Sequence, residues 1–238
     1  MTAKDRIILA LDVSSEGEAL ELVSELKDSV GAFKIGLELF TSTGPHIVQA
    51  VTDAGAERIF LDLKFHDIPN TVSGAARAAV RSGAWMFNIH ASGGSEMMVA
   101  AKEASGKEAD RLGVEPPLIL AVTVLTSTKE TMLREELGVA SSIEAQVVRL
   151  ARLAKDAGLD GVVASPREIG AIKAACESDF LVVTPGVRPA WAAANDQKRF
   201  TTPLEAVQNG SDYLVIGRPI TGAQDRRAAA ERIVQELQ

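Results

Sequence analysis

Short runs of aliphatic and β-branched residues alternate along this chain with longer segments whose apolar residues recur at helical spacing. In the first helical segment, Leu20, Val23 and Leu26 fall on one face, and Ser14 and Ser15 both offer a cap at its start. The strand-like runs lie at 6–12, 32–36, 58–64, 85–90, 117–124, 161–164, 180–184 and 213–217. Several of these runs are almost continuously apolar, which is typical of parallel strands covered on both faces.

Eight such βα units in 238 residues predict an α/β protein, a (β/α)8 TIM barrel in which 1–238 form a single catalytic domain. The alternative is an open, doubly wound sheet with a dinucleotide site, which needs a Gly-x-Gly-x-x-Gly turn after its first strand. Here the first strand is followed by residues 12–16 without a glycine, and Gly17 comes too late for that turn. The pattern therefore favours the barrel.

The amino-acid composition limits the kinds of partner that the protein could bind. With 25 Lys+Arg against 32 Asp+Glu, the net charge of -7 argues against binding nucleic acid or an anionic membrane through the overall field, so any phosphate site has to be local. The single cysteine, Cys176, forms no internal disulfide, and no apolar run reaches bilayer length. No signal-peptide pattern precedes the first strand, so we expect a cytoplasmic protein without a membrane partner.

Charged residues gather where the predicted strands end, which is the active-site face of such a barrel. Asp12 ends the first strand, Lys34 lies on the second, Asp62 and Lys64 lie on the third, and Asp67 follows. Asp62 and Lys64 are two residues apart, so alternation predicts that both face the barrel mouth. A structural ion pair is the alternative, but burying this many charges is costly unless they are paired and used.

A lysine surrounded by carboxylates keeps its proton. It is a poor Schiff-base nucleophile, which has to be neutral, but a good proton donor and a good partner for a developing carbanion. The charge pattern therefore argues against imine chemistry.

A second group of polar residues follows the later strands. Gly217 and Arg218 come after the eighth strand, where barrels usually bind phosphate. The segment 186–203 contains Arg188 and Gln197, and its length and donors predict a loop that closes over a phosphate. The three histidines lack ligand spacing, so we expect no zinc site, and His90 is predicted to be a hydrogen-bonded core residue.

The Asp-x-Lys-x-x-Asp signature at 62–67 resembles that of the orotidine 5′-phosphate decarboxylase family. Further segments resemble its bacterial members in the same order along the chain, at 9–12, 33–36, 68–72, 88–91, 122–127, 184–188, 196–197 and 215–221. The resemblance implies conversion of orotidine 5′-monophosphate to uridine 5′-monophosphate and CO2, in de novo pyrimidine synthesis. It also implies that no metal or organic cofactor takes part.

The same resemblance implies the roles of individual residues. Lys64 would donate a proton to C6 of the pyrimidine, Asp62 would sit against the substrate carboxylate, and Lys34 and Asp67 would complete an alternating charge array. The residues implied to bind substrate are Asp12 and Lys34 at the ribose, Thr126 at the pyrimidine edge, and Gln197, Gly217, Arg218 and Arg188 on the phosphate side. Asp67, Ile68 and Thr71 would reach into the neighbouring site of a two-fold homodimer.

Two alternatives stay open. One is a magnesium-dependent sugar-phosphate decarboxylase or synthase of the same superfamily. Three features of the sequence argue against it, namely residues 68–71, Gln197 and the long loop after the seventh strand. The other is a non-catalytic barrel that senses pyrimidine nucleotides. Such a sensor would keep Arg218 but would not need Lys34, Asp62, Lys64 and Asp67 together.

Overall fold

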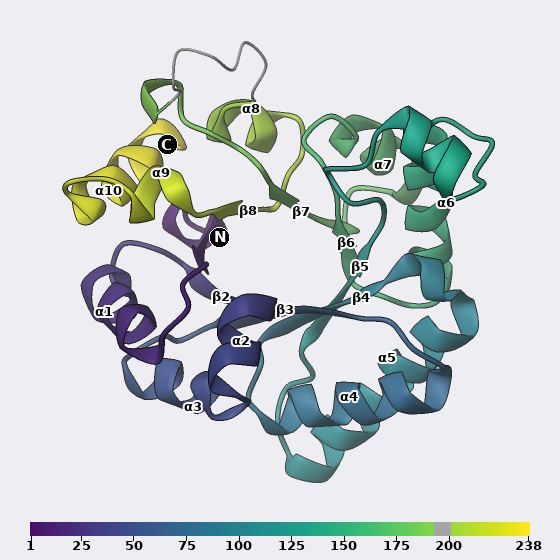
Figure 1. Ribbon diagram of the computed structural model, residues 1–238, viewed down its shortest axis with the longest axis horizontal. Helices are drawn as coiled ribbons and strands as arrows, with labels where there is room; N and C mark the ends of the chain where they lie inside the picture. Colours follow the sequence, from purple (N-terminus) through teal and green to yellow (C-terminus); the bar gives the residue numbers. More distant parts are fainter. Residues whose placement is uncertain (193–200) are drawn as a thin grey trace.

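The computed structural model describes residues 1–192 and 201–238, and in this part of the chain eight parallel strands close into a barrel in sequence order (Figure 1). The strands are β1 (Ile7–Leu11), β2 (Ala32–Gly36), β3 (Ile59–Phe65), β4 (Met86–His90), β5 (Leu118–Val122), β6 (Gly161–Val163), β7 (Leu181–Pro185) and β8 (Tyr213–Ile216). Pairing of β1 with β8 closes the barrel. The predicted fold is confirmed, with every strand end within two residues of its predicted position.

The helices form the outer layer (Figure 1). They are α1 (Glu16–Leu26), α2 (Leu37–Thr43), α3 (His46–Asp53), α4 (Pro69–Arg81), α5 (Ser95–Leu112), α6 (Ile143–Asp156), α7 (Ile169–Cys176), α8 (Pro203–Gln208), α9 (Arg218–Thr221) and α10 (Arg226–Glu236). Eight βα units predict one helix after each strand, but two helices follow β2, because Gly44 adopts a φ of +88° and Pro45 follows it, which ends α2 before α3 begins.

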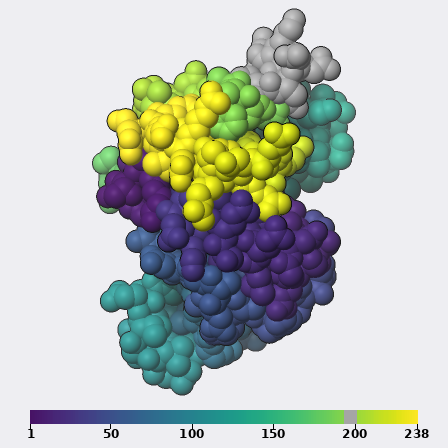
Figure 2. All heavy atoms as spheres, turned by 90° about the vertical axis from the view of Figure 1, so that its left-hand side faces the viewer, coloured from purple at the N-terminus to yellow at the C-terminus, as the bar shows by residue number. Residues whose placement is uncertain are grey.

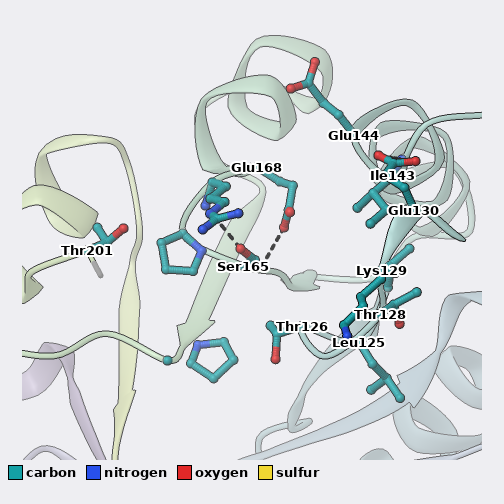
Figure 3. Close-up of a pocket in the computed structure, with 15 residues that line it drawn as sticks. Leu125, Thr126, Thr128, Lys129, Glu130, Ile143, Glu144, Ser165, Glu168 and Thr201 are labelled. Carbon is teal, nitrogen blue, oxygen red and sulfur yellow. Dashed lines mark hydrogen bonds between the residues drawn. The ribbon is translucent and has the colours of Figure 1, made fainter. Parts of the chain in front are cut away.

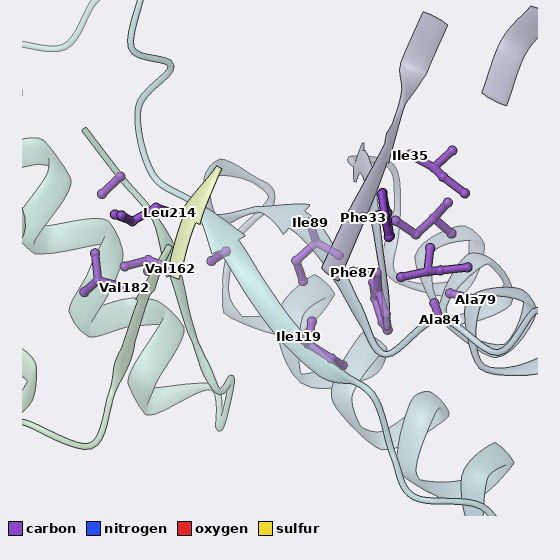
Figure 4. Packing of buried hydrophobic residues seen from close by; sticks show 14 of the residues in the cluster. Phe33, Ile35, Ala79, Ala84, Phe87, Ile89, Ile119, Val162, Val182 and Leu214 are labelled. Atoms are coloured by element: carbon purple, nitrogen blue, oxygen red, sulfur yellow. The ribbon is translucent and has the colours of Figure 1, made fainter. Parts of the chain in front are cut away.

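Alternation along each strand separates two packed regions. One face of the strands packs against the helices, with Phe33, Ile35, Phe87 and Ile89 among the buried residues (Figure 4). The other face fills the barrel interior. The apolar residues buried there are Ile8, Ala10, Ala32, Phe60, Met86, Leu120, Val183 and Val215.

The barrel interior changes from apolar to polar toward the carboxyl ends of β2, β3 and β4. Two positions beyond the interior residues Ala32, Phe60 and Met86 stand Lys34, Asp62 and Asn88. Because side chains two apart on a strand share a face, these three also point inward. The sheet itself therefore delivers polar groups to the barrel mouth.

The amino ends of the strands carry a different kind of polar contact. At two places an aspartate that precedes a strand accepts a backbone N–H of the preceding strand and an ammonium group of a helix. Asp160 accepts from Ile119 and Lys102, and Asp212 accepts from Val182 and Lys173, all at 2.8 Å. Each of these amino-end clamps ties two strands and a helix together.

The last helix closes the outer layer beside the first, as the yellow and purple segments of Figure 2 show. Arg226 donates to Glu21 and Glu25, each at 3.0 Å. Beyond β7, the Trp191 ring packs against the core and lies 4.7 Å from the Arg232 guanidinium carbon. Within the described ranges, no helix has the length and apolar character needed to cross a bilayer.

Candidate active site

The third strand, β3, is irregular where it approaches the barrel mouth. Between two contacts with β4, β3 advances from Leu61 to Phe65 while β4 advances only from Phe87 to Ile89, so β3 carries a bulge. Within the bulge Lys64 adopts a φ of +50°, a left-handed conformation that is costly for a residue with a side chain. The alternation argument for Asp62 and Lys64 was therefore incomplete, although both side chains do meet at the mouth.

Asp62 is the centre of the charged group. Its carboxylate lies 2.6 Å from Lys64 Nζ and 3.4 Å from Lys34 Nζ, and it accepts a 2.6 Å hydrogen bond from the Asn88 amide. Lys34 Nζ also lies 2.9 Å from the Asp12 carboxylate. The predicted convergence of Asp12, Lys34, Asp62 and Lys64 is thus present in the structure.

The electrostatics of Asp62 follow from these contacts. Burial alone would raise the pKa of the Asp62 carboxyl, but the ammonium groups of Lys34 and Lys64 and the hydrogen bonds from Lys64 and Asn88 outweigh it. The pKa of Asp62 is therefore below its ordinary value. The site holds an ionised carboxylate between two lysine ammonium groups.

Two glycines shape the space around this group. A Cβ built on Gly36 would lie 2.9 Å from Lys34 Nζ, so a side chain there would displace the ammonium. A Cβ on Gly217 would lie 3.7 Å from the Asp12 carboxylate, which places the end of β8 against the end of β1. Sequence reasoning gave no role to Gly36 or Asn88, although a lone Asn in the apolar run of β4 was a visible signal.

The predicted partner-site residues lie apart from the charged group. Asp67, Ile68 and Thr71 are exposed where β3 leads into α4, and the side chain of Asp67 accepts a hydrogen bond from the Ile68 N–H. Ile68 is 67% exposed, unusual for so apolar a residue. Within the described chain, these residues do not complete the array around Asp62.

The predicted phosphate-side residues are brought together only in part. Arg218 is exposed at the start of α9, directly after Gly217, and Arg188 is half-buried after β7. The Arg188 backbone N–H donates to the Thr201 carbonyl at 3.0 Å, which joins the two chain segments there. Gln197 lies outside the described residues.

A cavity of about 1020 Å³ opens at the carboxyl ends of β5, β6 and β7 (Figure 3). Thr126, Glu168 and Thr201 line it, with Ser165 donating its N–H to Glu168. The Asp62 group is not part of its lining. Thr126 is the predicted substrate-binding residue that belongs to this lining.

His90 was predicted to be a hydrogen-bonded core residue, but it lies at the barrel mouth beside His66. His90 is half-buried and its ring centroid is 5.3 Å from that of the exposed His66. Burial first, and then the neighbouring charges of His66 and Lys64, lower the pKa of His90. In the described ranges no three His, Cys, Asp or Glu side chains are grouped as metal ligands.

A closed (β/α)8 barrel with two lysines and two aspartates at its mouth has the architecture of a barrel enzyme whose site can stabilise charge. Residues 5–233 match the profile of the Orotidine 5'-phosphate decarboxylase / HUMPS family, and the chain belongs to this family. Relatives named orotidine 5'-phosphate decarboxylase include that of Syntrophomonas wolfei, 54% identical over 100% of both chains, and that of Moorella thermoacetica, 55% identical over 100% of this chain and 94% of the relative.

Solved structures agree with this placement. The orotidine 5'-phosphate decarboxylase of Lactobacillus acidophilus is 40% identical, with a TM-score of 0.86 over 97% of this chain and 98% of that one. The enzyme of that name from Pyrococcus horikoshii is 26% identical with a TM-score of 0.77 over 97% of this chain and 98% of that one. The similarity therefore extends over the whole barrel.

Proposed function

We propose that this chain is an orotidine 5′-phosphate decarboxylase, which converts orotidine 5′-monophosphate to uridine 5′-monophosphate and CO2 in pyrimidine synthesis. The observation that carries the proposal is the Asp62 carboxylate held between the Lys64 and Lys34 ammonium groups, 2.6 and 3.4 Å away. Full-length relatives of that name at 54% and 55% identity support it. The barrel over 1–238 acts as one catalytic domain.

The reaction breaks the bond between C6 and the carboxylate carbon, and the electron pair of that bond stays on C6 as CO2 leaves. Lys64 gives its proton to C6, and the resulting neutral amine regains a proton from solvent. A fixed ammonium beside the developing carbanion stabilises it. Asp62 sits against the substrate carboxylate, and its negative charge disfavours the bound ground state relative to the transition state.

Different residues around the barrel mouth bind different parts of the substrate. Asp12 and Lys34 hold ribose hydroxyls, and Thr126 lies at the pyrimidine edge. Arg218, with Gly217, Arg188 and Gln197, holds the phosphate. Because the phosphate does not react, its binding energy is available to position the pyrimidine against Lys64.

We further propose a two-fold homodimer in which Asp67, Ile68 and Thr71 of one subunit complete the site of the other. The support is their exposure at the β3–α4 junction, above all that of the apolar Ile68. Mixing Lys64→Ala with Asp67→Ala subunits tests this. A mixed dimer would contain one site with neither lesion and regain activity, whereas additive loss without regain would show that Asp67 serves its own subunit.

The direct test of the function is loss of the orotate chromophore after orotidine 5′-monophosphate is added to purified protein in excess chelator. Rapid loss supports a decarboxylase that needs no added metal. No loss, with activity on a sugar phosphate restored by magnesium, would move the chain to the metal-dependent branch of the family. Tight binding of uridine monophosphate without turnover under either condition would favour a sensor.

A further inference from the structure

The interior polar residue Asn88 is not accounted for by the proposed reaction. It is fully buried in β4, between the apolar Phe87 and Ile89 that face the helices. A buried amide without partners is costly, so its contacts have to explain its presence.

Both ends of the Asn88 amide are engaged. The NH2 group donates to Asp62 Oδ1 at 2.6 Å, and the amide oxygen accepts the backbone N–H of Lys64 at 2.8 Å. The reverse orientation would set the amide oxygen against a carboxylate and NH2 against N–H. The two partners therefore fix which way the amide points.

The contact with the Lys64 N–H lies at the irregular part of β3, which is the bulge with the left-handed Lys64 in it. The Lys64 N–H lies in the bulge, where the regular β3–β4 ladder is interrupted, and the Asn88 oxygen replaces the missing strand partner. Lys64 is in its left-handed conformation at this contact, and its ammonium group meets the same Asp62 oxygen that Asn88 contacts.

We propose that Asn88 is a positioning residue of the decarboxylation site, which fixes the Asp62 carboxylate and the backbone of Lys64 in the geometry that the reaction uses. The inference rests on the proposed function. Asn88 holds the reacting groups without being placed at substrate itself, so its loss lowers turnover more than substrate binding.

Two variants separate the two contacts. Asn88→Leu is similar in size and removes both hydrogen bonds, while Asn88→Asp keeps an acceptor for the Lys64 N–H and loses the donor to Asp62. Ser211→Ala is the matched control, because buried Ser211 donates to Thr184 at 2.8 Å at the amino end of β8, away from the mouth.

The expected result is a fall in kcat of about ten- to a hundredfold in both Asn88 variants, the range that a hydrogen bond to a charged group contributes. KM for orotidine 5′-monophosphate should change less than kcat. Ser211→Ala should keep both constants while lowering the unfolding temperature.

The acid side of the pH profile gives a readout that a merely structural residue would not move. The Asn88 hydrogen bond is one of the contacts that lower the pKa of Asp62. Losing it raises that pKa, so the pH below which kcat falls moves upward, and further in Asn88→Asp, where a second carboxyl faces the first. The titratable and charged groups facing this position are Lys34 from β2, Lys64 from β3, His90 from β4, and Asp12 through Lys34.

A folded Asn88→Leu or Asn88→Asp enzyme with wild-type kcat and an unmoved acid limb would overturn the inference. If Asn88→Leu does not fold, Asn88→Asp decides alone, because it retains the contact to the bulge. An inactive wild-type protein would overturn the proposed function and this inference with it, whereas an active wild type with unaltered variants overturns the inference alone.

Discussion

Lysine–aspartate pairs stand at both ends of this barrel, but the two ends use them differently. At the amino end, the carboxylates of Asp160 and Asp212 each accept one ammonium and one backbone N–H of a neighbouring strand. At the mouth, the donors to Asp62 in the described chain are all side chains, namely Lys34, Lys64 and Asn88. The carboxylates of Asp160 and Asp212 therefore hold backbone as well as an ammonium group, while that of Asp62 is held by side chains alone within the described chain.

The largest expected effect tests this contrast with one lysine from each end. Lys64→Ala should lower the rate of decarboxylation by about 10²–10⁴-fold, the range for loss of a general acid. Lys173→Ala should leave kcat unchanged. Rates are measured with orotidine 5′-monophosphate on protein whose circular dichroism matches wild type, and comparable losses in the two variants would erase the distinction.

A second test at the mouth compares a substrate that carries the phosphate with one that lacks it. Arg218→Ala should lower kcat/KM for the nucleotide by about ten- to a hundredfold, because a charged contact to the phosphate is lost. The corresponding nucleoside lacks the phosphate, so its much slower reaction should change little. Equal losses on both substrates would place Arg218 in the fold or the chemistry instead of in phosphate binding.

The amino-end clamps should respond in stability. Asp212→Ala leaves the buried Val182 N–H without its acceptor, which lowers the free energy of unfolding by about 1–3 kcal/mol. Asp212→Asn keeps an acceptor oxygen and should lose less. Urea titrations measure both, and kcat per folded enzyme should stay at the wild-type value. A change in kcat would show that the two ends are coupled.

The smallest effects compare two lysines on α5. Lys102 is bound to Asp160 and is 36% exposed, whereas Lys107 pairs with Glu103 and is 77% exposed. Lys102→Met should reduce the free energy of unfolding by about 1 kcal/mol, a charged hydrogen bond discounted for solvent screening. Lys107→Met should reduce it by about 0.3–0.5 kcal/mol. Equal values would mean that the clamp adds nothing beyond a surface pair.

Much of the fold could be predicted because apolar continuity marks strands that are covered on both faces. The break between α2 and α3 was missed, although Gly44-Pro45 is a recognisable turn signal. Helical periodicity on both sides concealed it.

The site was predictable where it depends on strand ends and less so where it depends on contacts between strands. Asp12, Lys34 and Asp62 follow from their places on or beside β1, β2 and β3. The bulge at Lys64 does not, because it is an interruption of the pairing between β3 and β4, where the Lys64 N–H donates to Asn88 on another strand. No periodicity within β3 encodes that contact.

The chain has two tryptophans, and their fluorescence can distinguish the two ends of the barrel. Trp85 precedes β4 at the amino end, with its ring 5.4 Å from both Tyr213 and the Arg58 guanidinium carbon. Trp191 follows β7, beneath Arg232. With Trp85 replaced by Phe, the remaining indole emission reports from the substrate side of the barrel. With Trp191 replaced instead, it reports from the clamped side, so fluorescence can follow ligand arrival and unfolding separately.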